Sequence, residues 1–141
     1  IEIGIPVDSL VTSELLQSIF HITSPIHDGA IIIQRARITA AGCFLPLTKS
    51  DTLALDMGTR HRAAVGITEE TDAVVILVSE EKGTISLVHE GKIHEIANGD
   101  QLKKRLKKYF ASEIQSEKLE KMKREKGEES FGVKLKKFIG K

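Results

Sequence analysis

The chain has 141 residues, 40% of them hydrophobic, and a formal net charge of +1. This length and composition predict one soluble globular domain, and the chain has neither an apolar run long enough to span a membrane nor a signal-peptide pattern at its start. The single cysteine, Cys43, excludes an internal disulfide, so we expect a reducing compartment.

The net charge conceals an uneven distribution. Residues 1–100 carry 7 Lys and Arg against 14 Asp and Glu, whereas residues 101–141 carry 14 against 6. The first hundred residues therefore form an acidic body, and the basic segment after them is electrostatically separate. We interpret this segment as a solvated tail, with binding to nucleic acid or anionic lipid as the alternative.

Two elements are predicted near the N-terminus. Residues 1–6 alternate as an extended segment would, and Pro6 should end any regular ladder there. Residues 11–20 place four apolar side chains on one helical face, and either Thr12 or Ser13 is the expected N-cap.

A buried hairpin should follow. Residues 30–34 are rich in β-branched side chains and apolar on both faces, which predicts a strand in the middle of a sheet. Residues 35–37 can turn the chain back into an antiparallel neighbour over residues 38–45. Residues 46–57 fit either a loop or a short helix.

The second half predicts a helix and three strands. The helix should begin at Thr59, with Thr59 as its cap, and should be weakened at Gly66. Its start would offer free backbone N–H groups to an anion. Residues 72–79 predict a second buried strand, and antiparallel strands over residues 84–89 and 92–96 should follow it.

These elements predict an α/β fold: a single domain with a mixed, mostly antiparallel central sheet flanked by helices. A last helix should be capped at residues 98–100 and pack through an apolar stripe containing Leu102 and Leu106. Beyond residue 112 the composition shifts to Glu and Lys, with a break expected at residues 127–130 and a short basic amphipathic segment over residues 131–139.

Three short motifs carry the chemistry: His27-Asp28-Gly29-Ala30, Gly58-Thr59-Arg60-His61-Arg62, and Val78-Ser79-Glu80-Glu81. A carboxylate beside a glycine suits a metal ion, and a hydroxyl with two guanidiniums suits phosphate oxygens. The pattern therefore favours a site for a metal and a nucleotide. An acidic body that holds a polyanionic nucleotide would need divalent cations to offset the repulsion.

In this order and spacing, the motifs resemble those of the diadenylate cyclase domain family, whose signatures are an Asp-Gly-Ala and an Arg-His-Arg. The resemblance extends to about Phe110, so we expect a catalytic domain over residues 1–111 and a basic tail over residues 112–141. It implies that two ATP molecules are condensed into cyclic di-AMP with release of two pyrophosphates. Since two nucleotides must meet, it also implies a homodimer in which each protomer supplies half of the site.

The resemblance assigns roles to individual residues. Asp28 would ligate the metal, either Mg²⁺ or Mn²⁺, and help to deprotonate the attacking hydroxyl. On a regular helix Arg60 and Arg62 cannot both face one phosphate, and which of Glu80 and Glu81 points inward stays open. The expected catalytic residues are Asp28, Arg60 and His61; the expected metal ligands are His27, Asp28 and Glu81; the expected substrate-binding residues are Gly29, Ala30, Phe44, Leu45, Gly58, Thr59, Arg60, His61, Arg62, Ser79 and Glu80.

The chain departs from the family pattern in two places. It lacks the helix and aliphatic strand with which the family domain normally opens, and Phe44 stands where well-known members have a tyrosine. A nucleotide-binding regulatory module without turnover is therefore the alternative function. The closest branch implies a cytoplasmic domain tethered to the cell membrane through an upstream segment. Regulatory proteins are expected as further partners, whereas nucleic acid is not an expected partner.

Overall fold

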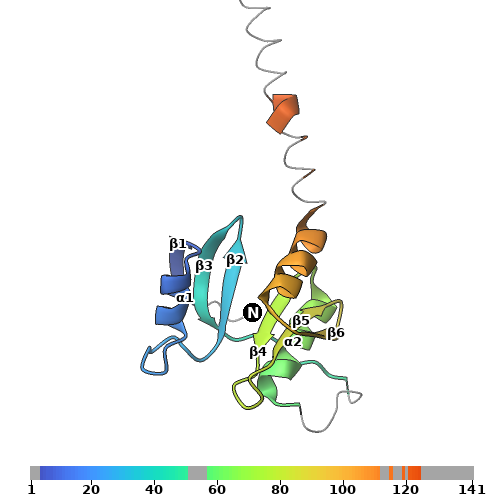
Figure 1. The fold of residues 1–141 in the computed structure, drawn as a ribbon. Helices are drawn as coiled ribbons and strands as arrows, with labels where there is room; N and C mark the ends of the chain where they lie inside the picture. Colours follow the sequence, from blue (N-terminus) through green and yellow to red (C-terminus); the bar gives the residue numbers. More distant parts are fainter. Residues whose placement is uncertain (1–3, 51–56, 112–114, 116–118, 120, 125–141) are drawn as a thin grey trace, which may run out of the picture. The chain divides into compact units, whose positions relative to one another are not determined.

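The computed structural model describes residues 4–50, 57–111, 115, 119 and 121–124 (Figure 1). The chain divides into two compact units, Ile1–Ile96 and Ala97–Lys141. The first unit contains both sheets and the residues of the three motifs, so it is the unit that positions the candidate site.

The first sheet contains strands β1 (Ile5–Leu10), β2 (Ala30–Gln34) and β3 (Arg37–Cys43), in the order β1-β3-β2 with both pairings antiparallel. Strand β3 is therefore central, and the prediction that β2 lies in the middle of a sheet is wrong for the strands described. The β-branched run is apolar on both faces, but Ile33 is half exposed. Pro6 also lies within β1 and does not end it, because β1 is an edge strand, where proline is tolerated.

Helix α1 (Ser13–Ile19) packs beside this sheet. Thr12 caps the helix by accepting a hydrogen bond from the backbone N–H of Leu15 at 3.2 Å, which confirms one of the two predicted caps. Its buried Ile19 joins Ile38 and Ala41 of β3 in a small hydrophobic core.

The second sheet contains β4 (Val75–Val78), β5 (Ile85–His89) and β6 (Lys92–Ile96), paired antiparallel in chain order. Helix α2 (Thr59–Glu70) packs on β4 and β5. Ala64 and Val65 of the helix meet Leu77 and Val88 of the sheet in a second core.

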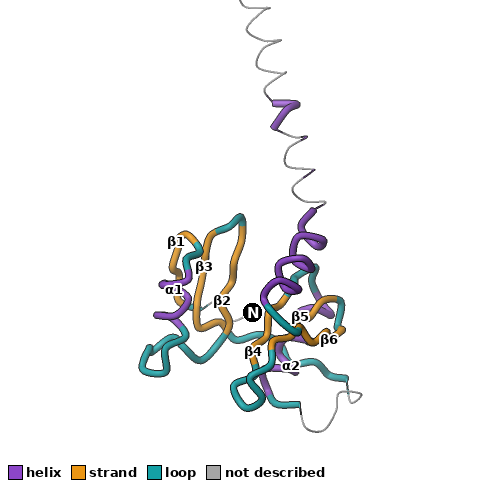
Figure 2. Tube along the Cα trace, viewed as in Figure 1, coloured by secondary structure: helices purple, strands orange, loops and turns teal. Residues whose placement is uncertain are grey.

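The α/β class is confirmed, and every described strand pairing is antiparallel. The described strands form two three-stranded sheets, however, instead of the one central sheet that was expected (Figure 2). Strands β2 and β4 are both edge strands of these sheets, and Ile76 and Val78 of β4 are about half exposed. An apolar run predicts that a strand will be covered, but it does not say which element covers it.

Gly66 of α2 has a packing role that its sequence position did not reveal. A Cβ atom there would overlap the backbone oxygen of Pro46 and lie 2.6 Å from the backbone nitrogen of Thr48. The same Thr48 N–H donates to the carbonyl of Arg62 at 3.0 Å. Glycine is expected to weaken a helix. At position 66, however, the missing side chain lets the segment after β3 lie directly against α2.

The second unit begins with a helical stretch over residues 99–111. The Asn98 side chain accepts from the backbone N–H of Gln101 at 2.9 Å, so the predicted cap at residues 98–100 is confirmed. None of the described helices is long and apolar enough to cross a membrane. Three predicted segments lie wholly or partly outside the described residues. They are the break at residues 127–130, the amphipathic segment over residues 131–139, and residues 51–56 of the segment predicted as a loop or short helix.

Candidate functional site

Asp28 and Arg60 meet although 31 residues separate them in the sequence. Asp28 lies in the loop before β2, and Arg60 is the second residue of α2. The Nη2 atom of Arg60 lies 3.6 Å from Oδ1 of Asp28. The side chains of Asp28 and Arg60 are 76% and 50% exposed, so a ligand from solvent can reach both. The first two motifs therefore converge, as the prediction of a shared site requires.

Glu80 brings the third motif to the same place. Arg60 Nη1 donates a hydrogen bond to Glu80 Oε2 at 2.9 Å. Glu80 sits in the turn after β4, which is closed by the hydrogen bond from Ser79 N–H to the carbonyl of Thr84 at 2.9 Å. Of the two glutamates left open by the sequence, Glu80 is the one that faces Arg60, and Glu81 is an exposed residue of the same turn. We call Asp28, Arg60 and Glu80 the Arg60 cluster.

The imidazole of His27 is held in one orientation. Its Nδ1 lies 2.6 Å from the carbonyl oxygen of Ser24. Because a carbonyl can only accept, Nδ1 must carry the proton, and in the neutral ring Nε2 then holds the lone pair. Histidines that ligate metals commonly donate their other ring N–H in this way. The geometry is therefore compatible with the predicted role of His27.

The backbone conformation and packing at position 29 require a glycine. Its φ is +134°, and a Cβ atom would lie 2.7 Å from the carbonyl carbon of Gly42 and 2.8 Å from its Cα. Ala30, the next residue, is paired with Cys43 in the sheet. Glycine is thus needed at position 29 for the close approach of two backbones, and this contact fixes where the neighbouring Asp28 lies.

The start of α2 differs from the prediction in one detail. Gly58, not Thr59, is the N-cap, because Gly58 has the extended backbone and Thr59 is already helical. Gly58 provides no side-chain cap, and its carbonyl accepts from the N–H groups of His61 and Arg62 at 3.1 and 3.2 Å. His61 and Arg62 are half-buried, whereas Thr59 is exposed. A glycine-capped helix start is a suitable place for an anion.

Phe44 is exposed, which argues against a core role. It follows β3 and is 63% exposed, whereas the adjacent Leu45 is half-buried. An exposed aromatic ring is free to stack on a planar ligand. The assignment of Phe44 and Leu45 to adenine stays a prediction.

A complete protein cage for a metal is not formed by the residues described. Within these residues, no group of three or more His, Cys, Asp and Glu side chains is placed to hold a metal ion. Asp28 and Glu80 nevertheless present two carboxylates to the same guanidinium. Mg²⁺ is usually held by one or two carboxylates together with substrate phosphates and water. The carboxylates of Asp28 and Glu80 therefore fit a divalent cation that binds together with a phosphorylated substrate.

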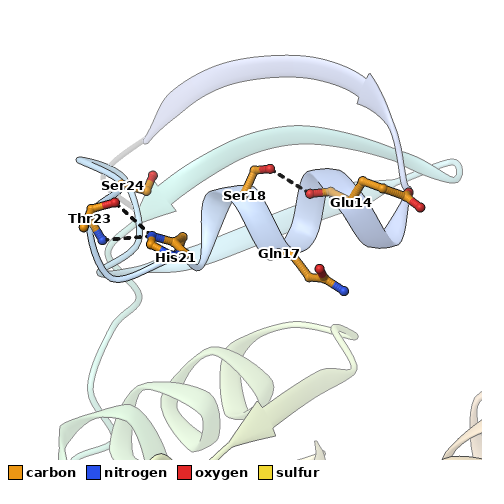
Figure 3. Close-up of a pocket in the computed structure, with 6 residues that line it drawn as sticks. All are labelled: Glu14, Gln17, Ser18, His21, Thr23 and Ser24. Carbon is orange, nitrogen blue, oxygen red and sulfur yellow. Dashed lines mark hydrogen bonds between the residues drawn. The ribbon is translucent and has the colours of Figure 1, made fainter.

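The structure also has a hollow that the sequence did not predict. A shallow pocket of about 520 Å³ lies along α1 and the turn after it (Figure 3). His21 and Thr23 are joined there by a hydrogen bond of 2.8 Å between Nδ1 and Oγ1. At the other end of the pocket, the pKa of the Glu14 carboxyl is lowered, first by a hydrogen bond from its own backbone N–H and then by the Ser13 hydroxyl. None of the predicted site residues lines this pocket; the lining residues are Glu14, Gln17, Ser18, His21, Thr23 and Ser24.

Comparison with known families identifies one matching model. The model described as DAC, "DisA bacterial checkpoint controller nucleotide-binding", matches residues 1–93. These residues include all three motifs and both sheets except the last three residues of β6.

Characterised relatives carry consistent names. The cyclic di-AMP synthase CdaA of Bacillus subtilis is 47% identical over 110 residues, which cover 78% of this chain and 40% of that protein. A diadenylate cyclase of Listeria monocytogenes is 46% identical over 108 residues, covering 77% of this chain and 40% of its own. The chain thus spans less than half the length of these two relatives.

Solved structures show the same similarity. DacA from Staphylococcus aureus superposes with a TM-score of 0.72 at 43% identity, over 76% of this chain and 71% of that one. A hypothetical membrane-spanning protein from Bacillus cereus gives a TM-score of 0.67 at 40% identity, over 69% of this chain and 48% of that one.

Proposed function

The chain belongs to the DAC family of nucleotide-binding domains, and on this premise we propose that it is a diadenylate cyclase, a nucleotidyltransferase that condenses two ATP molecules into cyclic di-AMP. The observation that carries the proposal is the meeting of Asp28 with Arg60, which joins the two signature motifs in one exposed site. Relatives named for this activity are 46–47% identical to the chain and support the proposal.

The reaction consists of two equivalent phosphoryl transfers. In each, the 3′-hydroxyl of one nucleotide attacks the α-phosphate of the other, a new P–O bond forms, and the bond to pyrophosphate breaks. Positioning and neutralisation of charge supply most of the rate enhancement in such reactions. We assign Arg60 to the phosphates, and Asp28 to accepting the hydroxyl proton. Thr59 and the free N–H groups at the start of α2 would hold further phosphate oxygens.

The remaining roles follow from position. His61 would assist at the phosphates, and Arg62, two residues further along the helix, would point away from Arg60 toward a carboxylate or a partner protomer. Gly29, Ala30, Gly58 and Ser79 would line the nucleotide. Phe44 and Leu45 would contact adenine, and Phe44 would do so by stacking alone because it has no hydroxyl.

A divalent cation, Mg²⁺ or Mn²⁺, would be held by Asp28 with His27 and one glutamate. Glu81 was expected for this position, and the geometry offers Glu80 as the second carboxylate near Asp28. The cation would supply charge neutralisation at the phosphates. The protein provides the carboxylates and keeps the His27 ring oriented through its hydrogen bond to Ser24.

We further propose that the active unit is a two-fold homodimer, because two nucleotides must face each other and one chain presents a single Arg60 cluster. In the whole protein the domain would lie on the cytoplasmic side of a membrane to which an upstream segment tethers it. ATP is then the substrate, and regulatory proteins would act by altering how protomers meet.

The direct test is product formation. The chain is incubated with ATP and Mn²⁺, and cyclic di-AMP and pyrophosphate are measured; the Asp28→Asn variant should lose activity by about 10²- to 10⁴-fold because it lacks the proton acceptor. A matched control is Asp72→Asn, which removes one carboxylate from the turn before β4 and should leave the rate unchanged. Equal rates for wild type and Asp28→Asn would refute the role of Asp28. Tight ATP binding without product under either metal would instead select the non-catalytic regulatory module.

A further inference from the structure

One guanidinium holds two carboxylates at once in the Arg60 cluster. Nη1 of Arg60 donates to Glu80 at 2.9 Å, while Nη2 lies 3.6 Å from Asp28. The carboxylates come from the loop before β2 and the turn after β4, so the guanidinium bridges segments that adjoin different sheets. Arg60 is therefore the counterion of both acids in this structure.

The position of Arg60 on its helix is electrostatically unusual. The first turn of α2 contains no acidic residue, and the partial positive charge at a helix start favours anions and disfavours a cation. A guanidinium at the second helical residue is stabilised there when anions accompany it. The two carboxylates meet that need in this structure, and the phosphates of a nucleotide would meet it equally well.

The carboxylates that Arg60 neutralises are also the ones suited to a divalent cation. A cation near Asp28 and Glu80 would repel the guanidinium and compete with it for the same oxygens. All three side chains are at least half exposed, and ion pairs in such surroundings are weak enough to exchange. A competing charge can therefore break the ion pairs within the cluster.

We propose that Arg60 is a counterion switch that makes cation binding depend on the nucleotide. Without nucleotide, Arg60 pairs with Asp28 and Glu80 and weakens the binding of a divalent cation. When a nucleoside triphosphate binds, Arg60 moves to its phosphates and leaves both carboxylates to the cation. This inference rests on the proposed function, because it places a triphosphate at this site; by linkage, the cation then strengthens nucleotide binding by the same factor.

The experiment measures Mn²⁺ affinity directly, by the loss of the free-ion signal in electron paramagnetic resonance. The full chain is titrated with Mn²⁺ alone and again with 3′-deoxy-ATP, which lacks the attacking hydroxyl and cannot react. Arg60→Gln should bind Mn²⁺ alone about two- to fivefold more tightly than wild type, the range expected for removing exposed ion pairs. The gain in Mn²⁺ affinity on adding 3′-deoxy-ATP should be smaller in Arg60→Gln than in wild type.

A matched control separates the switch from a general charge effect. Arg35→Gln removes the same charge from the exposed turn between β2 and β3, and its Mn²⁺ affinity should stay that of wild type. Arg60→Lys keeps the charge but replaces the planar guanidinium with a single ammonium group, so its Mn²⁺ affinity should lie between those of wild type and Arg60→Gln. If circular dichroism shows that Arg60→Gln is unfolded, Arg60→Lys takes its place in the test. Mn²⁺ affinity in Arg60→Gln and Arg60→Lys that is equal to or weaker than that of wild type would overturn the switch.

Failure of the switch and failure of the proposed function are distinguishable. Cyclic di-AMP formation by wild type, with no change of Mn²⁺ affinity in the variants, would remove the switch and leave the cyclase. The predicted change of Mn²⁺ affinity without any product would keep the switch and remove the cyclase.

Discussion

The two ends of helix α2 are built in opposite ways. At its start, Gly58 supplies no side-chain cap and Arg60 projects toward two exposed carboxylates. Further along, residues 64–68 are buried, and the Thr68 hydroxyl donates to the carbonyl of Val65 at 2.9 Å and accepts from the N–H of Gly91 at 3.1 Å. The comparison teaches that one helix can carry stability at one end and chemistry at the other, so changes at the two ends should be separable.

The largest expected effect is on activity, at the start of the helix. Arg60→Gln should lower kcat/KM for ATP by about 10²- to 10³-fold, because a preorganised donor to the phosphates is lost. Its free energy of unfolding should change by less than about 0.5 kcal/mol, since the side chain is half exposed. Product assays and urea unfolding measure the two quantities, and a loss of stability as large as the loss of transition-state stabilisation would contradict the separation.

Gly66→Ala should produce the largest loss of stability at the buried end. A Cβ atom would overlap the Pro46 carbonyl oxygen and press on Thr48, and such overpacking typically costs about 1–3 kcal/mol. Urea unfolding gives the difference. Gly99→Ala is the control, because a Cβ atom there meets nothing within 4 Å and stability should not fall. An unchanged urea midpoint for Gly66→Ala would contradict this prediction, because it would show that the segment after β3 shifts to accommodate the added methyl group at little cost.

A smaller loss is expected from Thr68→Val. The substitution keeps the shape of the side chain but leaves the Gly91 N–H without the acceptor at 3.1 Å, which should cost about 1 kcal/mol. Thr68→Ser retains the hydroxyl and should retain the hydrogen bond, so it separates this term from packing. Loss of cyclase activity at temperatures where Thr68→Val is folded would argue against the division between the two ends.

The smallest effect should come from Gly58→Ser. A serine cap accepts a hydrogen bond that Gly58 cannot, and this should stabilise the helix by a few tenths of a kcal/mol. A Cβ atom at this position meets nothing within 4 Å, so no strain opposes the gain. The added side chain lies where phosphate is expected and should raise the KM for ATP. A higher melting temperature with an unchanged KM would place the nucleotide elsewhere.

Much of the fold could be predicted from the sequence because periodicity and caps are local signals. Thr12 caps α1 as expected, α2 begins at Thr59, and β6 occupies the predicted residues 92–96. The arrangement of strands was less predictable. Residues 30–34 have the composition of a central strand, yet β2 is an edge strand of its described sheet, because pairing depends on distant partners that composition does not encode.

The candidate site shows the same division between local and distant signals. The motifs identified Asp28, Arg60 and Glu80 individually, but the choice of Glu80 over Glu81 required coordinates, since orientation in a turn does not follow strand parity. The resemblance placed Gly29 among the substrate-binding residues, and the structure adds the close approach of its backbone to Gly42. That contact joins two distant segments and leaves no local trace in the sequence.

The central claim is that Asp28 and Arg60 act on the same nucleotide, and a double-mutant cycle tests it most directly. The values of kcat/KM are measured for wild type, Asp28→Asn, Arg60→Gln and the double variant. If both side chains serve one reaction centre, the loss in the double variant should be clearly smaller than the product of the two single losses. Losses that multiply fully would show that the two residues act independently, and would contradict a shared site.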